Sequence, residues 1–98
     1  APHLTVKVGN KVEKIAIEDT NFEVGFHDDA DFQLPGKRFL GKKQFLIKEI
    51  GPKNFEVRAM SFWASVQVDG KKLSGSVKLK NGTTIDAGGL KFRFRKGD

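Results

Sequence analysis

Cysteine is absent from this chain of 98 residues. Disulfides, thiol nucleophiles and cysteine-bound metals are therefore excluded. A chain of this length can bury about two-thirds of its unfolded surface as one domain, so it can fold without a disulfide or a metal. Because residue 1 is Ala instead of Met, we expect residues 1–98 to be a single domain excised from a longer protein.

Long apolar runs are also absent. No stretch approaches the roughly 20 apolar residues of a membrane-spanning helix, and no signal-peptide pattern opens the sequence. We therefore expect no membrane span. The lack of cysteine favours a reducing compartment, which predicts an intracellular protein, and the sequence does not decide between nucleus and cytoplasm.

The residues that enzymes and metal sites need are missing as well. His3 and His27 stand far apart without a partner at ligand spacing, and we expect both on the surface. Asp28, Asp29 and Asp31 lack the glycine and the distal glutamate of a calcium loop, so their expected role is to form a turn. No serine has a base at a recognisable spacing. We therefore expect no enzyme, no cofactor and no metal site.

What the chain does contain is an alternation of apolar and polar residues along most of its length. Apolar side chains recur at every second position in seven runs, which begin at Leu4, Ile15, Phe22, Phe55, Val66, Val77 and Leu90. Successive side chains of a strand point to opposite faces, so each run predicts a strand with one face in a core and one in water. No window carries a sustained helical stripe, and we expect no long helix.

Turn-forming pairs separate these runs. Gly and Asn tolerate the positive φ of tight hairpins, and the turn pairs are Gly9-Asn10, Pro35-Gly36, Gly51-Pro52, Asp69-Gly70, Asn81-Gly82 and Gly88-Gly89. Many short strands at regular spacing predict an all-β protein, either an antiparallel sandwich or a barrel.

The formal net charge of the chain is +6. Such an excess fits an acidic partner, which includes nucleic acid, a phosphorylated protein and an anionic membrane face. Lysines are spread through nearly every segment and no continuous basic run dominates, so the sequence favours ordinary solubility as the explanation.

The runs follow one another in an informative order. FEVG at 22–25 precedes DFQLP at 31–35 and QFLI at 44–47, and then come FEV at 55–57, VQVDG at 66–70, LKNGTTIDAG at 79–88 and FRF at 92–94. In order and spacing this resembles the forkhead-associated (FHA) domain over nearly the whole chain, and the second half is most similar to FHA domains of the forkhead-box K type. The resemblance implies an all-β, two-sheet antiparallel β-sandwich with no long helix, whose loops at one end hold a phosphothreonine peptide.

The residues that bind the ligand in that family are replaced here. By the resemblance, the family's phosphate-contacting arginine falls on Phe26 and its serine falls on Gly41. The arginine that follows this serine falls on Lys42, and the structural histidine falls on Gln44. The asparagine that holds the ligand backbone falls on Ala64, directly after Phe62-Trp63. A phosphate group with about two negative charges is bound best by planar, bidentate donors, and Phe26 offers none. Gly41 has no hydroxyl group, and Ala64 cannot form a hydrogen bond with a peptide backbone through its side chain. We therefore interpret the chain as a degenerate FHA domain without phosphothreonine specificity.

This interpretation predicts a non-enzymatic protein–protein interaction module that binds another protein or protein segment independently of phosphothreonine. By the resemblance, five apolar residues lie on or near the loops at the ligand end: Phe26, Phe39, Leu40, Phe62 and Trp63. Aromatic side chains gathered at a surface are typical anchors of interfaces. The alternative for any single one of these residues is that its side chain packs in the core. Phe26 alternates with Val24 and would then point inward, and Trp63 would form a lid on the sandwich.

Two other functions stay open. One is residual anion binding by the basic loop 37–43, whose cations are Lys37, Arg38, Lys42 and Lys43. These would hold a phospho-ligand or a nucleic-acid backbone as point charges, unless they simply form a solvated loop. The other is a structural role as a scaffold that orients neighbouring domains or assembles a larger complex. Anion binding would weaken steeply with salt, whereas binding through aromatic side chains would weaken much less.

Overall fold

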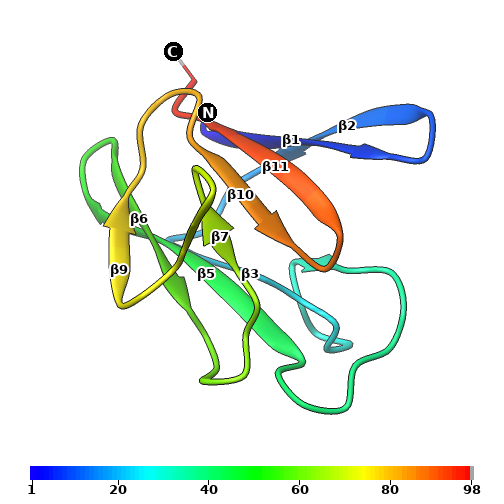
Figure 1. The fold of residues 1–98 in the computed structure, drawn as a ribbon. Coiled ribbons are helices and arrows are strands. Elements are labelled where there is room, and N and C mark those ends of the chain that lie inside the picture. Colours follow the sequence, from blue (N-terminus) through cyan, green and yellow to red (C-terminus); the bar gives the residue numbers. More distant parts are fainter. Residues whose placement is uncertain (98) are drawn as a thin grey trace.

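The computed structural model describes residues 1–97, which form two β-sheets and no helix (Figure 1). The first sheet has the order β2-β1-β11-β10-β7-β8 and the second β4-β3-β5-β6-β9. The strands of the first sheet are β1 (His3–Val8), β2 (Lys11–Ala16), β7 (Gln67–Val68), β8 (Lys71–Lys72), β10 (Thr84–Ala87) and β11 (Leu90–Arg95). Those of the second are β3 (Asn21–Gly25), β4 (Phe32–Gln33), β5 (Lys43–Gly51), β6 (Asn54–Ala59) and β9 (Ser76–Lys78). The predicted all-β, two-sheet sandwich is confirmed.

One strand pair departs from the predicted antiparallel arrangement. β4 runs parallel to β3, with Val24 opposite Phe32 and Gly25 opposite Gln33. The loop 26–31 carries the chain back along β3, and the backbone amide of Asp31 donates to the carbonyl oxygen of Glu23 at 2.9 Å. The next segment therefore runs beside β3 in the same direction.

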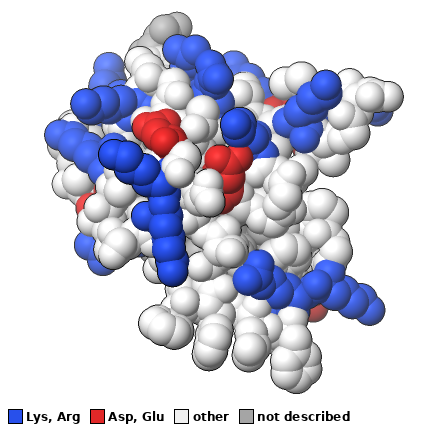
Figure 2. Space-filling view, viewed as in Figure 1, with Lys and Arg blue, Asp and Glu red and all other residues white. Residues whose placement is uncertain are grey.

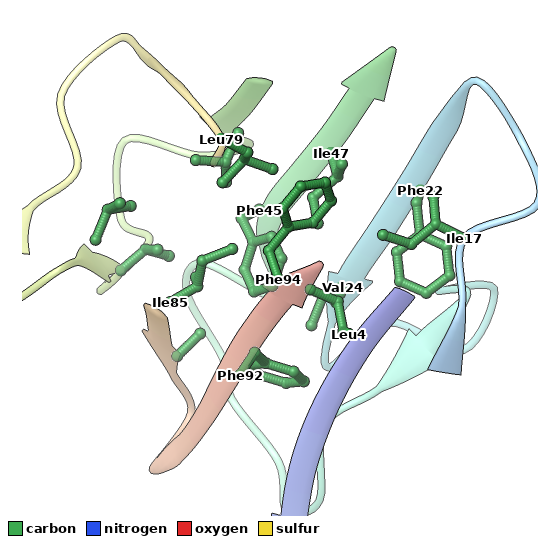
Figure 3. Packing of buried hydrophobic residues seen from close by; sticks show 14 of the residues in the cluster. Leu4, Ile17, Phe22, Val24, Phe45, Ile47, Leu79, Ile85, Phe92 and Phe94 are labelled. Atoms are coloured by element: carbon green, nitrogen blue, oxygen red, sulfur yellow. The ribbon is translucent and has the colours of Figure 1, made fainter. Parts of the chain in front are cut away.

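The core lies between the two sheets, and Figure 3 shows how its side chains meet. Phe92 and Phe94 of β11 and Phe45 of β5 are all fully buried. The rings of Phe45 and Phe92 have centroids 5.6 Å apart and lie edge to face, which is a favoured arrangement of aromatic pairs. Each of the seven alternating runs supplies buried side chains, so the inward faces predicted from the sequence are confirmed.

Two of the predicted turn pairs set the register of the first sheet. Asp69 and Gly70 have φ values of 50° and 83°, and they join β7 to β8. Gly88 and Gly89 have φ values of 58° and 79°, and they join β10 to β11. Two consecutive residues with positive φ are what a two-residue hairpin loop of type I′ requires.

Two long loops lie at the end of the sandwich that is opposite the chain termini, at the bottom of Figure 1. Residues 34–42 connect β4 to β5, and residues 60–66 connect β6 to β7. We refer to these two segments as the apical loops. The apical loops carry most of the residues that the sequence analysis predicted to bind a partner protein or an anion.

Candidate functional site

Arg38 connects the two apical loops. Its Nη2 donates a hydrogen bond to the carbonyl oxygen of Trp63 at 3.1 Å, and its Nε donates to the carbonyl oxygen of Leu40 at 2.9 Å. The guanidinium presents several donors in a rigid plane, which suits it to bridge two backbone segments. Arg38 is one of the candidate residues for residual anion binding, and its Nε and Nη2 donors are directed at the protein's own carbonyl groups.

Gln44 makes a second connection from inside the fold. Its side chain is fully buried, with Nε2 donating to the carbonyl oxygen of Gly41 at 2.6 Å and Oε1 accepting from the backbone amide of Ser65 at 3.2 Å. Its own carbonyl oxygen accepts from the amide of Met60 at 3.0 Å. Because buried polar groups need partners, these bonds fix the end of the loop 34–42 and both ends of the loop 60–66. Gln44 stands where the resemblance places the family's structural histidine.

Gly41 lies in contact with the backbone of Trp63. A Cβ atom at residue 41 would come within 2.6 Å of the carbonyl oxygen of Trp63, and Gly41 has a φ of 69°. A serine here would have to displace the neighbouring loop and adopt a backbone conformation that L-residues rarely take. The apical loops as they pack here therefore exclude the serine that the FHA resemblance would place at this position.

Four large apolar side chains of the apical loops face solvent. Phe39 is 93% exposed, Phe62 91%, Trp63 55% and Leu40 52%. The rings of Phe62 and Trp63 lie edge to face with centroids 5.4 Å apart. Figure 2 shows the corresponding lower end of the molecule as largely uncharged protrusions. Trp63 is therefore not a lid on the core, and four of the five apolar residues lie exposed at this end.

Phe26 differs from these four because it is only partly exposed and packs against the core. Its ring approaches the turn after β10, where a Cβ at Gly88 would lie 3.1 Å from its Cζ. Its backbone amide donates to the carbonyl oxygen of Lys42 at 2.7 Å. Phe26 also lines a pocket of about 610 Å³ whose other lining residues are Asp28, Gln33, Gly36, Lys37, Arg38, Phe39 and Lys42. The ring of Phe26 forms an apolar wall of this pocket.

Three of the four cations of the basic loop line one pocket. Lys37 and Lys42 line the pocket beside Phe26, whereas Lys43 begins β5 and does not line it. Arg38 lines the same pocket, but its guanidinium bonds the backbone of the apical loops. Two exposed ammonium groups therefore remain available to a ligand in this pocket.

Ala64 ends a compact turn of the second apical loop. Its amide donates to the carbonyl oxygen of Ser61 at 3.0 Å, and the amide of Trp63 donates to Ser61 Oγ at 3.1 Å. Ala64 is partly buried against the core. Because the methyl side chain offers no hydrogen-bonding group, residue 64 cannot hold a peptide backbone as an asparagine does.

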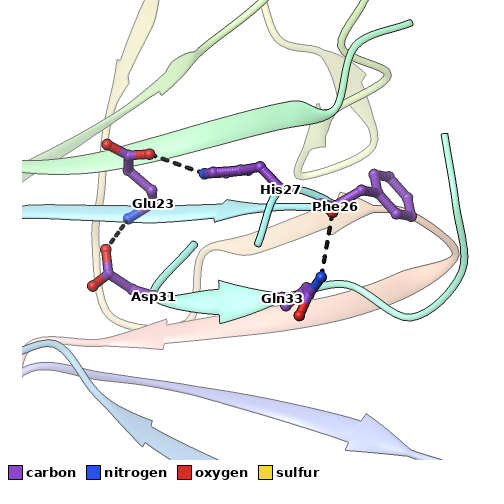
Figure 4. A network of polar contacts seen from close by, with 5 residues as sticks. All are labelled: Glu23, Phe26, His27, Asp31 and Gln33. Atoms are coloured by element: carbon purple, nitrogen blue, oxygen red, sulfur yellow. Dashed lines mark hydrogen bonds and ion pairs between the residues drawn. The ribbon is translucent and has the colours of Figure 1, made fainter. Parts of the chain in front are cut away.

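The expectation that both histidines lie on the surface is wrong for His27, which is only 8% exposed. Its Nε2 lies 3.0 Å from Glu23 Oε1 (Figure 4). The loop 26–31 turns back along β3 and encloses the ring. Sequence periodicity gives no signal for this, because His27 lies outside the alternating run.

Asp31 takes the local role predicted for the acidic cluster. Its Oδ2 accepts a hydrogen bond from the backbone amide of Glu23 at 2.7 Å, as Figure 4 shows. Asp28 instead lies beside Gln33, with 3.4 Å between Asp28 Oδ1 and Gln33 Nε2. Within residues 1–97 there is no group of three or more His, Asp or Glu side chains placed to hold a metal ion. The same residues include no helix long and apolar enough to cross a membrane.

Solved structures share this fold, although no family model and no curated protein matches the chain. Mycobacterium tuberculosis EmbR in complex with a low-affinity phosphopeptide has a TM-score of 0.80 at 17% identity, over 96% of this chain but only 24% of EmbR. The FHA domain of the Chlamydia trachomatis protein CT664 has a TM-score of 0.80 at 17% identity, over 95% of this chain and 94% of that one. The FHA1 domain of yeast Rad53 has a TM-score of 0.72 at 15% identity, over 95% of this chain and 74% of that one.

Proposed function

The chain has the fold of the FHA domain, and we propose that it is a non-enzymatic protein–protein interaction module that binds a partner through its apical loops. The observation that carries this proposal is the exposure of Phe39, Leu40, Phe62 and Trp63 on two loops that Arg38 and Gln44 hold together. Large apolar side chains on a pre-organised support lose little conformational freedom when a partner covers them. Such residues are typical anchors of binding interfaces.

We further propose that the partner is recognised without phosphothreonine. A phosphate group is bound best by charge-assisted and bidentate hydrogen bonds. By the resemblance, the arginine and the serine that supply such donors in FHA domains are replaced here by Phe26 and Gly41, whose side chains have no donor. The asparagine that holds the ligand backbone is replaced by Ala64, which also has no donor in its side chain. The contact of Gly41 with Trp63 supports the proposal, because it leaves no room for a serine side chain.

The partner that fits this surface is a protein segment with apolar side chains. Phe62 and Trp63 offer two perpendicular ring faces, while the pocket beside Phe26 adds an apolar wall and two ammonium groups, from Lys37 and Lys42. An apolar residue next to an acidic one would match both features. The phosphopeptide bound to EmbR supports a peptide as the kind of ligand for this fold.

Peptide libraries in matched phosphorylated and unphosphorylated forms test the proposal. We expect peptides selected by the domain to bind equally well, within about twofold, in the two forms, and to lose affinity when Trp63 is replaced by Ala. Hot-spot aromatic residues typically cost 2 kcal/mol or more when truncated, which is a loss of roughly 30-fold. A consistent preference for the phosphothreonine form would overturn phospho-independence.

Residual anion binding is the second candidate function, and the pocket beside Phe26 favours it because Lys37 and Lys42 both line that pocket. A salt titration separates the two functions. Binding through point charges falls steeply as salt is raised, whereas binding through buried apolar area changes little. A scaffold role through self-association would appear instead as a concentration-dependent mass in light scattering.

A further inference from the structure

The outer face of the six-stranded sheet is basic. Because Leu4, Val6, Phe92 and Phe94 point into the core, the alternate residues of β1 and β11 point outward. Residues that are directly opposite each other on neighbouring antiparallel strands have their side chains on the same face of the sheet. The outward-pointing residues of β2, β10, β7 and β8 therefore follow from the register of these strands. Its charged side chains are Lys7, Lys14, Lys72, Lys91, Arg93, Arg95 and Asp86. We refer to the six cations as the basic face.

The cations lie in rows that the strand register sets. Lys91, Arg93 and Arg95 follow one another at alternate positions of β11, which spaces their Cα atoms roughly 6.8 Å apart. Arg93 is opposite Thr5 on β1, and Thr5 is opposite Lys14 on β2, so Lys14 lies two strands away, at about 9.6 Å. Figure 2 shows Lys and Arg side chains over much of the upper part of the molecule, with some Asp and Glu side chains among them.

The opposite outer face, on the five-stranded sheet, has a different charge pattern. There the cations Lys48, Arg58 and Lys78 are interspersed with Glu23 and Glu56. Glu56 forms an ion pair with Arg58, and Glu23 Oε1 lies at hydrogen-bonding distance from His27 Nε2. On the basic face, by contrast, no cation forms an ion pair with any carboxylate of residues 1–97. The excess positive charge of the chain is therefore concentrated on one side of the sandwich.

The basic face is also hollowed at the end near the chain termini. A pocket of about 470 Å³ is lined by Ala1, His3, Lys14, Asn81, Arg95 and Gly97. Lys14 and Arg95 thus line one concavity from different strands, and it is large enough for a phosphodiester group. A phosphate there would meet an ammonium and a guanidinium group, the two groups that bind phosphate most strongly in proteins.

The side chains of the basic face favour some polyanionic ligands over others. This face carries no Phe or Trp, because the aromatic residues of β11 face the core, so it has no platform on which the bases of a single strand would stack. Val12 is its one large apolar residue that is strongly exposed among residues 1–97, at 70%. A single valine gives a membrane surface little apolar area to accept, since interfacial binding depends on buried apolar area as well as charge.

We propose that the basic face binds the phosphodiester backbone of duplex nucleic acid without reading its base sequence. A duplex carries one negative charge per about 1.7 Å of its axis, so several phosphates fall within reach of cations spread over a face of this size. The molecule has a longest dimension of 37 Å, which corresponds to about 11 base pairs at 3.4 Å per pair. Lys72 lines a pocket with Ser65 of the apical loops, but the other five cations lie elsewhere, and the proposal does not depend on the function proposed for those loops.

Fluorescence anisotropy with a labelled DNA duplex of about 24 base pairs and arbitrary sequence tests this proposal on the 98-residue chain. We expect binding at 50 mM salt that weakens with a slope of roughly −3 to −5 in log K against log salt, as for four or five phosphate contacts. Replacing Lys91, Arg93 and Arg95 by Glu should weaken binding at least tenfold and reduce the slope by about three. Should that variant unfold, Arg93→Gln with Arg95→Gln tests the same face with a milder change.

The matched control carries the same change in net charge on the other side of the molecule. Lys48→Glu, Arg58→Glu and Lys78→Glu together, all on the outer face of the five-stranded sheet, should leave affinity within about threefold, because long-range charge contributes less than direct phosphate contacts. Equal losses in both triple variants, or no binding at 50 mM salt, would overturn the proposal. So would equally tight binding to phosphatidylserine vesicles or to polyglutamate, which would assign the face to a membrane or an acidic protein. A loss confined to a Lys37→Glu, Lys42→Glu, Lys43→Glu variant would likewise overturn it.

Discussion

The Oε1 atom of Gln44 accepts a hydrogen bond from the backbone amide of Ser65 at 3.2 Å, across 21 residues of sequence. The Nε2 atom of the same side chain donates to the carbonyl oxygen of Gly41 at 2.6 Å. One buried amide therefore sets the distance between the two apical loops. Because the side-chain amide of Gln44 is buried away from water, water molecules cannot replace its hydrogen bonds.

Gln44→Ala is expected to destabilise the protein and to release the apical loops. It leaves the carbonyl of Gly41 and the amide of Ser65 without a partner, at a cost of about 1–3 kcal/mol. Urea unfolding gives the change in free energy, and hydrogen exchange should show the largest loss of protection at the amide of Ser65. Gln33→Ala is the control, since Gln33 is exposed, and it should stay within about 0.5 kcal/mol. Equal effects of the two substitutions would contradict a bridging role for Gln44.

Gly41→Ser should not restore a phosphothreonine site. It adds a side chain at a φ of 69° and places Cβ 2.6 Å from the carbonyl oxygen of Trp63. We expect a loss of about 2–4 kcal/mol in the free energy of unfolding, from backbone strain together with displacement of the loop. Gly75→Ser is the matched control, because Gly75 has a φ of 65° and nothing within 4 Å of its Cβ position. It should cost only about 1–2 kcal/mol, the strain alone. If Gly41→Ser costs no more than this control, the apical loops can separate easily.

Trp63→Ala and Phe62→Ala should leave the melting temperature nearly unchanged while weakening partner binding. Both side chains are mostly exposed, and exposed substitutions usually stay within about 0.5 kcal/mol. Thermal unfolding and peptide titration measure the two effects separately. Val12→Ala, at another exposed apolar residue far from the apical loops, should change neither. A stability loss of about 3 kcal/mol for Trp63→Ala would instead place this ring in the core.

Lys37→Glu combined with Lys42→Glu, which changes both ammonium groups of the pocket beside Phe26, distinguishes the two candidate functions of the apical end. Binding through Phe62 and Trp63 should persist in this variant, with a change of less than about 1 kcal/mol at physiological salt, because exposed charges are screened. Anion binding in the pocket beside Phe26 should be lost. Titration with a phosphopeptide and with its unphosphorylated form at two salt concentrations provides the measurement.

Phe92→Ala should destabilise the sandwich far more than Trp63→Ala or Phe62→Ala. Phe92 is fully buried and contacts the rings of Phe32 and Phe45 edge to face. Removing a buried phenyl group typically costs about 3–5 kcal/mol through the lost burial and the cavity left behind. Chemical denaturation measures this loss. A cost below about 1 kcal/mol would mean that the core between the two sheets is not closely packed.

The sequence by itself determined which side chains face inward along each strand and where the tight hairpins fall. Alternation is a local property, so Phe92 and Phe94 could be assigned to the core without knowing their neighbours. The same pattern left Phe39, Phe62 and Trp63 outside any strand, which made them candidates for a surface. Turn chemistry is equally local, as Asp69-Gly70 shows.

Only the tertiary structure decided which of these local elements meet. His27 is buried, and Gln44 forms hydrogen bonds with both apical loops, because loops fold back against the sheets. The periodicity of apolar residues does not predict the course of a loop. Lys14 and Arg93 are separated by most of the chain, yet they lie on one face because β1 pairs with both β2 and β11. Pairing between distant strands depends on the fit of the whole core, so a basic face appears where the sequence showed only scattered lysines.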